Sequence, residues 1–293
     1  QCIVTTCMEH NAVARPLHYL EQQGIEVVKV AADSQGFIDP AAMLDACKAA
    51  DNIAMVAMNH CSNVTGTIQS IEEISSWCRE HGVIFLLDAA QSAGVLPIDV
   101  AGMHIDILVA PGHKGLFGPQ GTGFIYVRDG IDLRPFILGG TGNLSSELEQ
   151  PVQMPERFES GTLNTAGLAG LKAGLEFIES EGINTIRTHE QKLLETLWNG
   201  LDSIAGVTLY GAGPGPGHSG PISFTLNGND SAETGFILDH QFDIAVRTGL
   251  HCAPDAHRSI GTFPAGTVRV SPGYFNTQEH IHTFIKAVKS IAA

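Results

Sequence analysis

The chain has 293 residues, of which 43% are hydrophobic and 16% charged, a composition typical of a folded protein with a sizeable core. Its net charge of −15 at pH 7 argues against nucleic acid or an anionic membrane surface as a partner, because phosphate groups bind clustered Lys and Arg. No apolar run reaches the roughly 20 residues of a membrane span, and the first residues lack the pattern of a signal peptide. The six cysteines show neither zinc-site nor disulfide spacing, so we expect a cytoplasmic protein with reduced thiols and no metal.

Short apolar segments alternate with helical patterns through the first half of the chain. Strands are predicted at 2–6, 25–30, 52–58, 83–87, 105–110 and 121–127. Helices are predicted at 11–23, 40–49 and 70–81. Because strands that alternate with helices form βαβ units, we expect an α/β fold with a mostly parallel sheet covered on both faces.

After residue 165 the pattern changes to two long amphipathic helices, 166–182 and 184–204, followed by shorter strands and a final helix at 277–291. The predicted strands of this part are VTLYG, PISFTL, IAVRTG and TVRVS. The stretch GAGPGPGHSG at 211–220 is interpreted as a flexible loop. We therefore predict a large domain over residues 1–164 and a smaller α+β C-terminal domain over residues 165–293.

Two candidate functional residues follow predicted strands directly. Asp88 ends the run VIFLLD, and open parallel sheets bind ligands at the carboxyl ends of their strands; the alternative is an aspartate that caps a helix. Lys114 follows IDILVA inside GHKGLFGPQG, while the other lysines fall in predicted helices or a strand. Gly112 and Gly115 beside it indicate close backbone approach, although an ordinary surface lysine is the simpler interpretation.

Generic motifs narrow the chemistry. GHKGLFGPQG is not a phosphate-binding P-loop, because no Ser or Thr follows its lysine. AAQSAG departs from a serine nucleophile elbow at Ala90, and HExxH is absent, so a serine hydrolase and a metalloenzyme are weakly supported. Pyridoxal 5'-phosphate chemistry needs a lysine for a Schiff base and a carboxylate at the ring nitrogen. Lys114 and Asp88, on neighbouring strand ends, satisfy both requirements.

From MEHNAV at residue 8 to VRVSPGYFNT at residue 277, the chain resembles the cysteine desulfurase and selenocysteine lyase branch of the class-V aminotransferase-fold enzymes. The resemblance implies the type I fold of pyridoxal-phosphate-dependent transferases. It also implies L-cysteine or L-selenocysteine as substrate, a homodimer with composite active sites, and a possible sulfur-acceptor protein.

The same resemblance assigns the residues around the cofactor ring. In MEHN, His10 lies on the face of the ring, although an ordinary partly buried histidine is the alternative. In NHCSNVTGT, Asn63 lies beside the ring and its phenolic oxygen. In LLDAAQ, Asp88 meets the ring nitrogen and Gln91 the phenolic oxygen, and in GHK, Lys114 carries the cofactor.

The remaining assignments concern phosphate, substrate and sulfur. His113 contacts the phosphate, and Thr162 in RFESGT serves the phosphate of the other subunit. Arg269 in VRVSPGYFNT binds the substrate carboxylate, and Arg247 in VRTG is a second active-site arginine. Cys252 in RTGLHCAP takes the position of the sulfur-accepting cysteine of the short-loop subgroup.

Some features leave alternatives open. Cys252 could be an inert buried thiol, but a positive charge on the adjacent His251 would favour the thiolate. Pro111 stands where the family usually has a hydroxyl side chain that donates to the phosphate. The N-terminal part of the family fold, with a phosphate-binding turn, is absent from this chain. Another lyase, epimerase or aminotransferase of this fold, or a truncated non-catalytic remnant, are the alternative functions.

Overall fold

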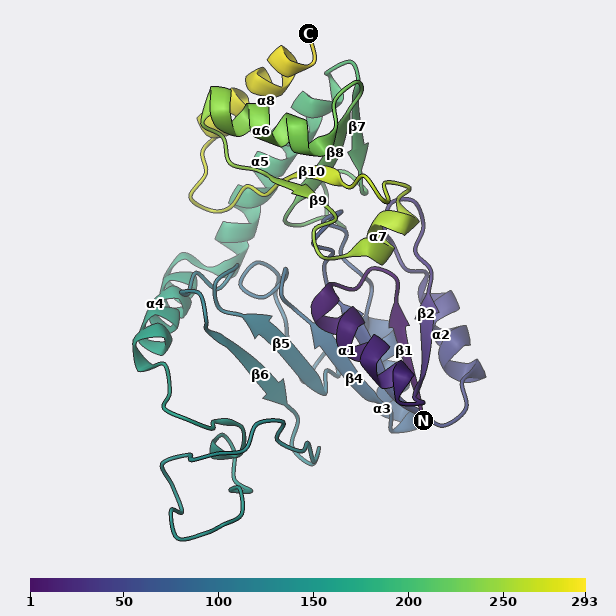
Figure 1. Ribbon diagram of the computed structural model, residues 1–293, viewed down its shortest axis with the longest axis vertical. Helices are drawn as coiled ribbons and strands as arrows, with labels where there is room; N and C mark the ends of the chain where they lie inside the picture. Colours follow the sequence, from purple (N-terminus) through teal and green to yellow (C-terminus); the bar gives the residue numbers. More distant parts are fainter.

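The computed structural model describes residues 1–293 as two β-sheets connected by two long helices (Figure 1). The first sheet has the strand order β2-β1-β3-β4-β5-β6, and every neighbouring pair is parallel except β5 and β6. Its strands are β1 (Cys2–Thr6), β2 (Glu26–Val30), β3 (Ile53–Asn59), β4 (Ile84–Asp88), β5 (Ile107–Pro111) and β6 (Gly123–Val127). The predicted α/β fold with a mostly parallel sheet is thus confirmed.

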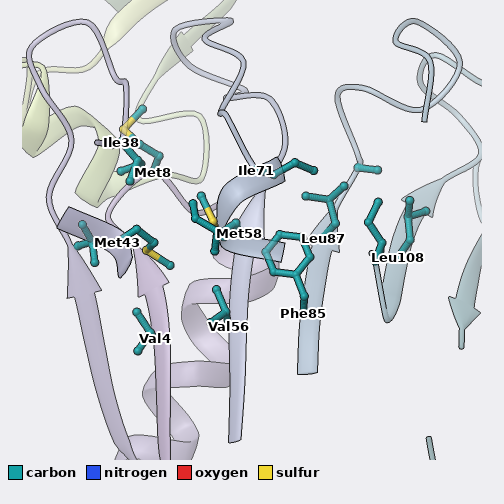
Figure 2. Packing of buried hydrophobic residues seen from close by; sticks show 14 of the residues in the cluster. Val4, Met8, Ile38, Met43, Val56, Met58, Ile71, Phe85, Leu87 and Leu108 are labelled. Carbon is teal, nitrogen blue, oxygen red and sulfur yellow. The ribbon is translucent and has the colours of Figure 1, made fainter. Parts of the chain in front are cut away.

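Three helices cover this sheet: α1 (Asn11–Gln22), α2 (Pro40–Ala49) and α3 (Glu72–His81). Figure 1 shows α1 in front of the sheet and α3 behind it. Alternate strand residues point to one face, so Val4, Met58 and Phe85 meet in one buried core (Figure 2). Each such side chain contributes about 1.5–3 kcal/mol on full burial. None of the helices is long and apolar enough to span a bilayer.

The second sheet is antiparallel, with the order β7-β8-β10-β9. The elements of this half are α4 (Thr165–Glu181), α5 (Ile183–Asp202), β7 (Val207–Tyr210), β8 (Ile222–Leu226), α6 (Ser231–Phe242), β9 (Arg247–Gly249), α7 (Pro254–Ser259), β10 (Thr267–Val270) and α8 (Gln278–Ile291). This half of the chain has its own hydrophobic core, which includes Leu197, Phe224 and Phe284. The sequence pattern missed α6 and α7, although Asp230 caps α6 and a proline opens α7.

Residues 211–220 form a loop, as predicted, and hydrogen bonds hold this loop against a neighbouring segment. The backbone N–H of Ile68 donates to the carbonyl of Gly217 (2.9 Å), and that of Ser219 donates to the carbonyl of Gly66 (2.8 Å). His218, which belongs to this loop, is buried with its ring against Gly66. Glycine and proline leave the backbone of this loop accessible, so a neighbouring loop satisfies its polar groups. The loop therefore fixes the second sheet against the segment that carries Asn63.

Gly66 provides a test of this contact. Its φ is +69°, and an added Cβ would overlap the ring of His218, whereas Gly82 has a φ of +67° and open space around it. Gly82→Ala should therefore cost only the backbone strain, about 1 kcal/mol. Gly66→Ala should cost about 2–4 kcal/mol, because the docked loop must also move. Urea unfolding of both variants measures the difference, and equal losses would show that the loop is not held tightly.

Candidate active site

The parallel strands bring several polar side chains to one edge of the first sheet. Because β1, β3, β4 and β5 run in the same direction, their carboxyl ends share this edge. A cavity of about 560 Å³ opens there, and its lining includes His10, Asp88, His113, Lys114 and Arg247. This volume lies within the range of roughly 300–1,000 Å³ that small-molecule sites occupy.

Glycines allow the turns that carry Asp88 and Lys114 to pack closely against each other. A Cβ on Gly115 would lie 2.5 Å from the carbonyl oxygen of Ala93, and one on Gly94 would overlap the carbonyl of Gly115. A Cβ on Gly112 would overlap the side chain of Thr122. The close approach that the sequence predicts around Lys114 is therefore an approach to the chain itself.

Asp88 is buried, and its Oδ1 accepts a hydrogen bond from the backbone N–H of Ala90 (2.9 Å). No helix begins here, so the interpretation of Asp88 as a helix cap is wrong. Burial raises the pKa of Asp88, while the Ala90 N–H and the charge of Lys114 act in the opposite direction. Burial likewise lowers the pKa of Lys114, which Asp88 opposes and Arg269 and Arg247 reinforce. A lysine with a lowered pKa presents its neutral, nucleophilic amine more readily.

His10 is fixed as the N-cap of α1. Its Nδ1 accepts from the backbone N–H of Ala12 (3.0 Å), which requires that this nitrogen carry no proton. Burial lowers the pKa of His10, and the nearby Lys114 lowers it further. The ring therefore presents a neutral face to the cavity.

Asn63 and Gln91 line a smaller recess of about 10 Å³, which shares His10, Asp88 and Lys114 with the main cavity. The Nδ2 of Asn63 donates to the carbonyl of His251 (2.7 Å), whereas its buried Oδ1 has no partner. A buried oxygen without a donor costs free energy, so this atom fits a ligand with a hydrogen-bond donor.

Cys252 lies on a strained loop between β9 and α7. His251 and Cys252 both have positive φ, +50° and +59°. The carbonyl of Cys252 accepts from the backbone N–H of Asn11 (2.7 Å), the residue after His10. The Arg247 guanidinium donates to Cys252 Sγ (3.0 Å). The loop is thus fixed against the start of α1, with its thiol beside a cation.

The expected charge on His251 is not there. Its ring is 2% exposed and bonded to the hydroxyl of Thr267 (2.9 Å), and burial lowers its pKa to about 3, with Arg269, His257 and Arg247 reinforcing this effect. A neutral imidazole cannot favour the thiolate, so the prediction that His251 does so is wrong. Arg247 supplies the neighbouring positive charge.

Arg269 comes from β10 and donates to the backbone carbonyl of Asn63 (3.0 Å). Its Nε is buried without a partner, and burial lowers its pKa to about 10, with Arg247 adding to the shift. No carboxylate pairs with either arginine. Two adjacent guanidinium groups without a counter-ion fit a ligand that carries a carboxylate.

The other predicted residues lie at the rim or away from the cluster. His113 is exposed and lines the cavity, and Pro111 ends β5 and lines it too. Thr162 is exposed within the long segment 128–164 and does not line the cavity. The structure adds Glu9 and Asn59, which sequence reasoning missed; Asn59 ends an apolar strand just as Asp88 does, and Glu9 adjoins His10.

Comparison with known proteins identifies the family of the chain. Residues 1–284 match the family described as aminotransferase class-V. The chain belongs to this family. A relative in Methanothermobacter thermautotrophicus, called a probable cysteine desulfurase, is 36% identical over 99% of this chain and 73% of its own length. A protein with the same description in Pyrococcus abyssi is 35% identical over 99% and 72%.

Solved structures of cysteine desulfurases share the fold. The apo structure of a cysteine desulfurase from Thermococcus onnurineus superimposes with a TM-score of 0.89 and 34% identity, over 100% of this chain and 72% of that one. The cysteine desulfurase CsdA from Escherichia coli, in an S-sulfonic acid form, gives a TM-score of 0.86 at 25% identity, over 99% and 71%.

The thiols of the chain should differ sharply in reactivity. Burial raises the pKa of Cys47 to about 11 and that of Cys61 to about 12, and it raises those of Cys2 and Cys78 as well. Cys252 is only half-buried, and its Sγ accepts a hydrogen bond from the guanidinium of Arg247. Iodoacetamide at pH 7 should therefore alkylate Cys252 well before these four, as peptide mass spectrometry can show. Labelling in urea, where all six cysteines should react alike, is the control; preferential labelling of a buried thiol in the folded protein would contradict the expectation.

Proposed function

We propose that the chain is a pyridoxal-phosphate-dependent cysteine desulfurase that converts L-cysteine to L-alanine, with L-selenocysteine as a related substrate. One observation carries the proposal: Arg247, which lines the cavity together with Lys114 and Asp88, donates a hydrogen bond to the Sγ of Cys252 (3.0 Å). The relatives called cysteine desulfurases support it.

The residues present fit the cofactor. When bound, pyridoxal phosphate supplies a ring that withdraws electrons from the substrate Cα. Lys114 would hold its aldehyde carbon and Asp88 its ring nitrogen, with His10 against the ring face. Asn63 and Gln91 would meet the phenolic oxygen, and the unpartnered Oδ1 of Asn63 supports this assignment. His113 would contact the phosphate, and Pro111 cannot, because it offers no N–H.

The chain's own residues account for the binding and sulfur steps. Arg269 and Arg247 bind the substrate carboxylate, and the amine of Lys114 moves the proton at Cα. The Cys252 thiolate attacks the substrate sulfur, so that a sulfur–sulfur bond forms and the carbon–sulfur bond breaks. The electron pair of that bond stays with the substrate carbon, which takes up a proton and leaves as alanine. A persulfide remains on Cys252, ready for an acceptor protein or small thiol.

Cys252→Ala tests the sulfur step. This variant should still bind the cofactor and L-cysteine, because Lys114 and Arg269 are untouched, while sulfide formation should fall by orders of magnitude. Lys114→Ala is the matched variant, and it should lose both the bound cofactor and sulfide formation. Absorbance of bound cofactor, sulfide release and the mass of the Cys252 peptide after cysteine treatment measure the three effects. Normal desulfuration by Cys252→Ala would show that Cys252 is not the sulfur acceptor. Wild-type protein that binds the cofactor but releases no sulfide would indicate another reaction of this fold, and wild-type protein without cofactor absorbance would indicate a non-catalytic protein.

We also propose that two copies form a homodimer with composite sites, and that the chain divides into domains at residue 164. The segment 128–164 extends away from the rest of the molecule (Figure 1) and exposes large apolar side chains, among them Phe136, Leu148 and Val152. Apolar side chains in such number favour burial against a partner. This supports the assignment of Thr162 to the phosphate of the other subunit. The six free thiols support a reducing compartment such as the cytoplasm.

Mixed subunits test the composite site. Lys114→Ala and Thr162→Val homodimers should each be impaired, Lys114→Ala almost completely. A heterodimer of the two contains one site free of both changes, so its activity should recover to about half that of the wild type. Tandem affinity tags isolate the heterodimer for assay. Heterodimers that recover no activity, or a fully active monomer, would disprove the shared site.

A further inference from the structure

The turn between β1 and α1 is tied to β3 through a buried carboxyl group. Glu9 is 3% exposed and lies directly before His10. Its Oε1 accepts from the hydroxyl of Thr6 (2.6 Å) on β1 and from the backbone N–H of Asn59 (3.0 Å) at the end of β3. Because Asn59 is paired with Asp88 in the sheet, Glu9 connects the turn that carries His10 to the strand beside Asp88.

The bonds around Glu9 form one network. The Asn59 side-chain amide donates to the carbonyl of Met8, and the backbone N–H of Met8 donates to Thr6 Oγ1 (3.1 Å). Residues 6–9 are thus fixed by both side chain and backbone, and His10 then begins the helix. We propose that Glu9 is a positioning residue: its buried carboxyl group sets His10 and Asp88 in their relative places at the cofactor site.

The protonation state of Glu9 follows from its surroundings. Burial raises the pKa of Glu9 to about 8, the hydrogen bonds from Thr6 and Asn59 lower it, and the charge of Asp88 raises it. The neighbours on β1 and β3 are neutral, so Asp88 on β4 is the charged group that acts on it. At neutral pH Glu9 therefore carries a proton. Two buried oxygens nearby have no hydrogen-bond partner, Oε2 of Glu9 and Oδ1 of Asn59. A protonated Oε2 can donate a hydrogen bond, whereas the amide Oδ1 can only accept one.

A neutral Glu9 also suits the chemistry of the site. Two ionised carboxylates so close would repel each other, and each would raise the pKa of the other. With Glu9 protonated, Asp88 is the only negative charge available to the ring nitrogen. Two carboxyl groups in one site then have different tasks, set by their environments. The inference rests on the proposed function, because it concerns residues proposed to bind the cofactor.

Two substitutions separate positioning from mere stability. Glu9→Gln keeps an acceptor for Thr6 and Asn59 and resembles the protonated acid, so it should behave like the wild type at pH 7. Glu9→Met has a similar size but no acceptor, so His10 should lose its fixed position. Leu197→Ala, in the core of the second sheet, is a control that loses stability far from the site.

The first readout needs no cofactor. In protein labelled at histidine Cε1, with His10→Gln to assign the signal, the His10 resonance should shift in Glu9→Met and remain unchanged in Glu9→Gln and Leu197→Ala. The second is pyridoxal phosphate affinity, which should fall at least tenfold in Glu9→Met and stay within about twofold in the other two. An unchanged His10 resonance and affinity in Glu9→Met would overturn the positioning role. Wild-type protein that binds no cofactor would instead overturn the proposed function, and the resonance would still decide the role of Glu9.

Should Glu9→Met not fold, the pH dependence of Glu9→Gln decides. The folded pKa of Glu9, about 8, lies above its ordinary value of 4.5, so the folded state retains a proton that the unfolded state releases. Wild-type stability should therefore decline relative to Glu9→Gln as the pH rises from about 5 to 8. The wild-type His10 resonance should shift with a midpoint near pH 8, and Glu9→Gln should abolish this shift. Identical pH profiles for the two proteins would disprove the inference.

Discussion

The site depends on one constraint, the burial of Asp88 and the partial burial of Lys114 at the carboxyl edge of the parallel sheet. Burial disfavours the charged form of each group, and their mutual attraction opposes it. Close packing of the turns that follow β4 and β5 contributes to this burial. That packing is possible because Gly94 and Gly115 have no Cβ, so the turns after β4 and β5 meet backbone to backbone.

Charge around this pair is distributed unevenly. The chain as a whole is strongly acidic, yet Arg247 and Arg269 reach the site without carboxylate partners, and burial lowers the pKa of Arg269. A partly buried cation without a counter-ion, such as Arg269, destabilises a fold unless a ligand compensates it. The two arginines favour a ligand that carries a carboxylate, and the unpartnered Oδ1 of Asn63 favours one that also carries a hydrogen-bond donor.

The thiol of Cys252 is connected to the same constraint through the backbone. The loop of Cys252 accepts hydrogen bonds from the backbone of Asn11 and from the side chain of Asn63. The half of the chain that contains the second sheet therefore places the thiol beside residues of the first half. The docked loop 211–220 strengthens this connection at the segment that carries Asn63. Rotation of one sheet unit against the other would therefore change both the thiol and the Asn63 contacts.

The sequence by itself determined the local features: strands and helices alternate with clear periodicity, and Asp88 and Lys114 stand at strand ends, where chemistry concentrates in parallel sheets. It could also point to Cys252, because a motif is a local pattern. Only the tertiary structure decided what surrounds each group. His251 is neutral because burial and two arginines act on it, Glu9 is protonated because it is desolvated beside Asp88, and residues 211–220 are docked because a distant loop offers matching backbone groups. Desolvation and long-range hydrogen bonding depend on residues far apart in the chain, and no local pattern records them.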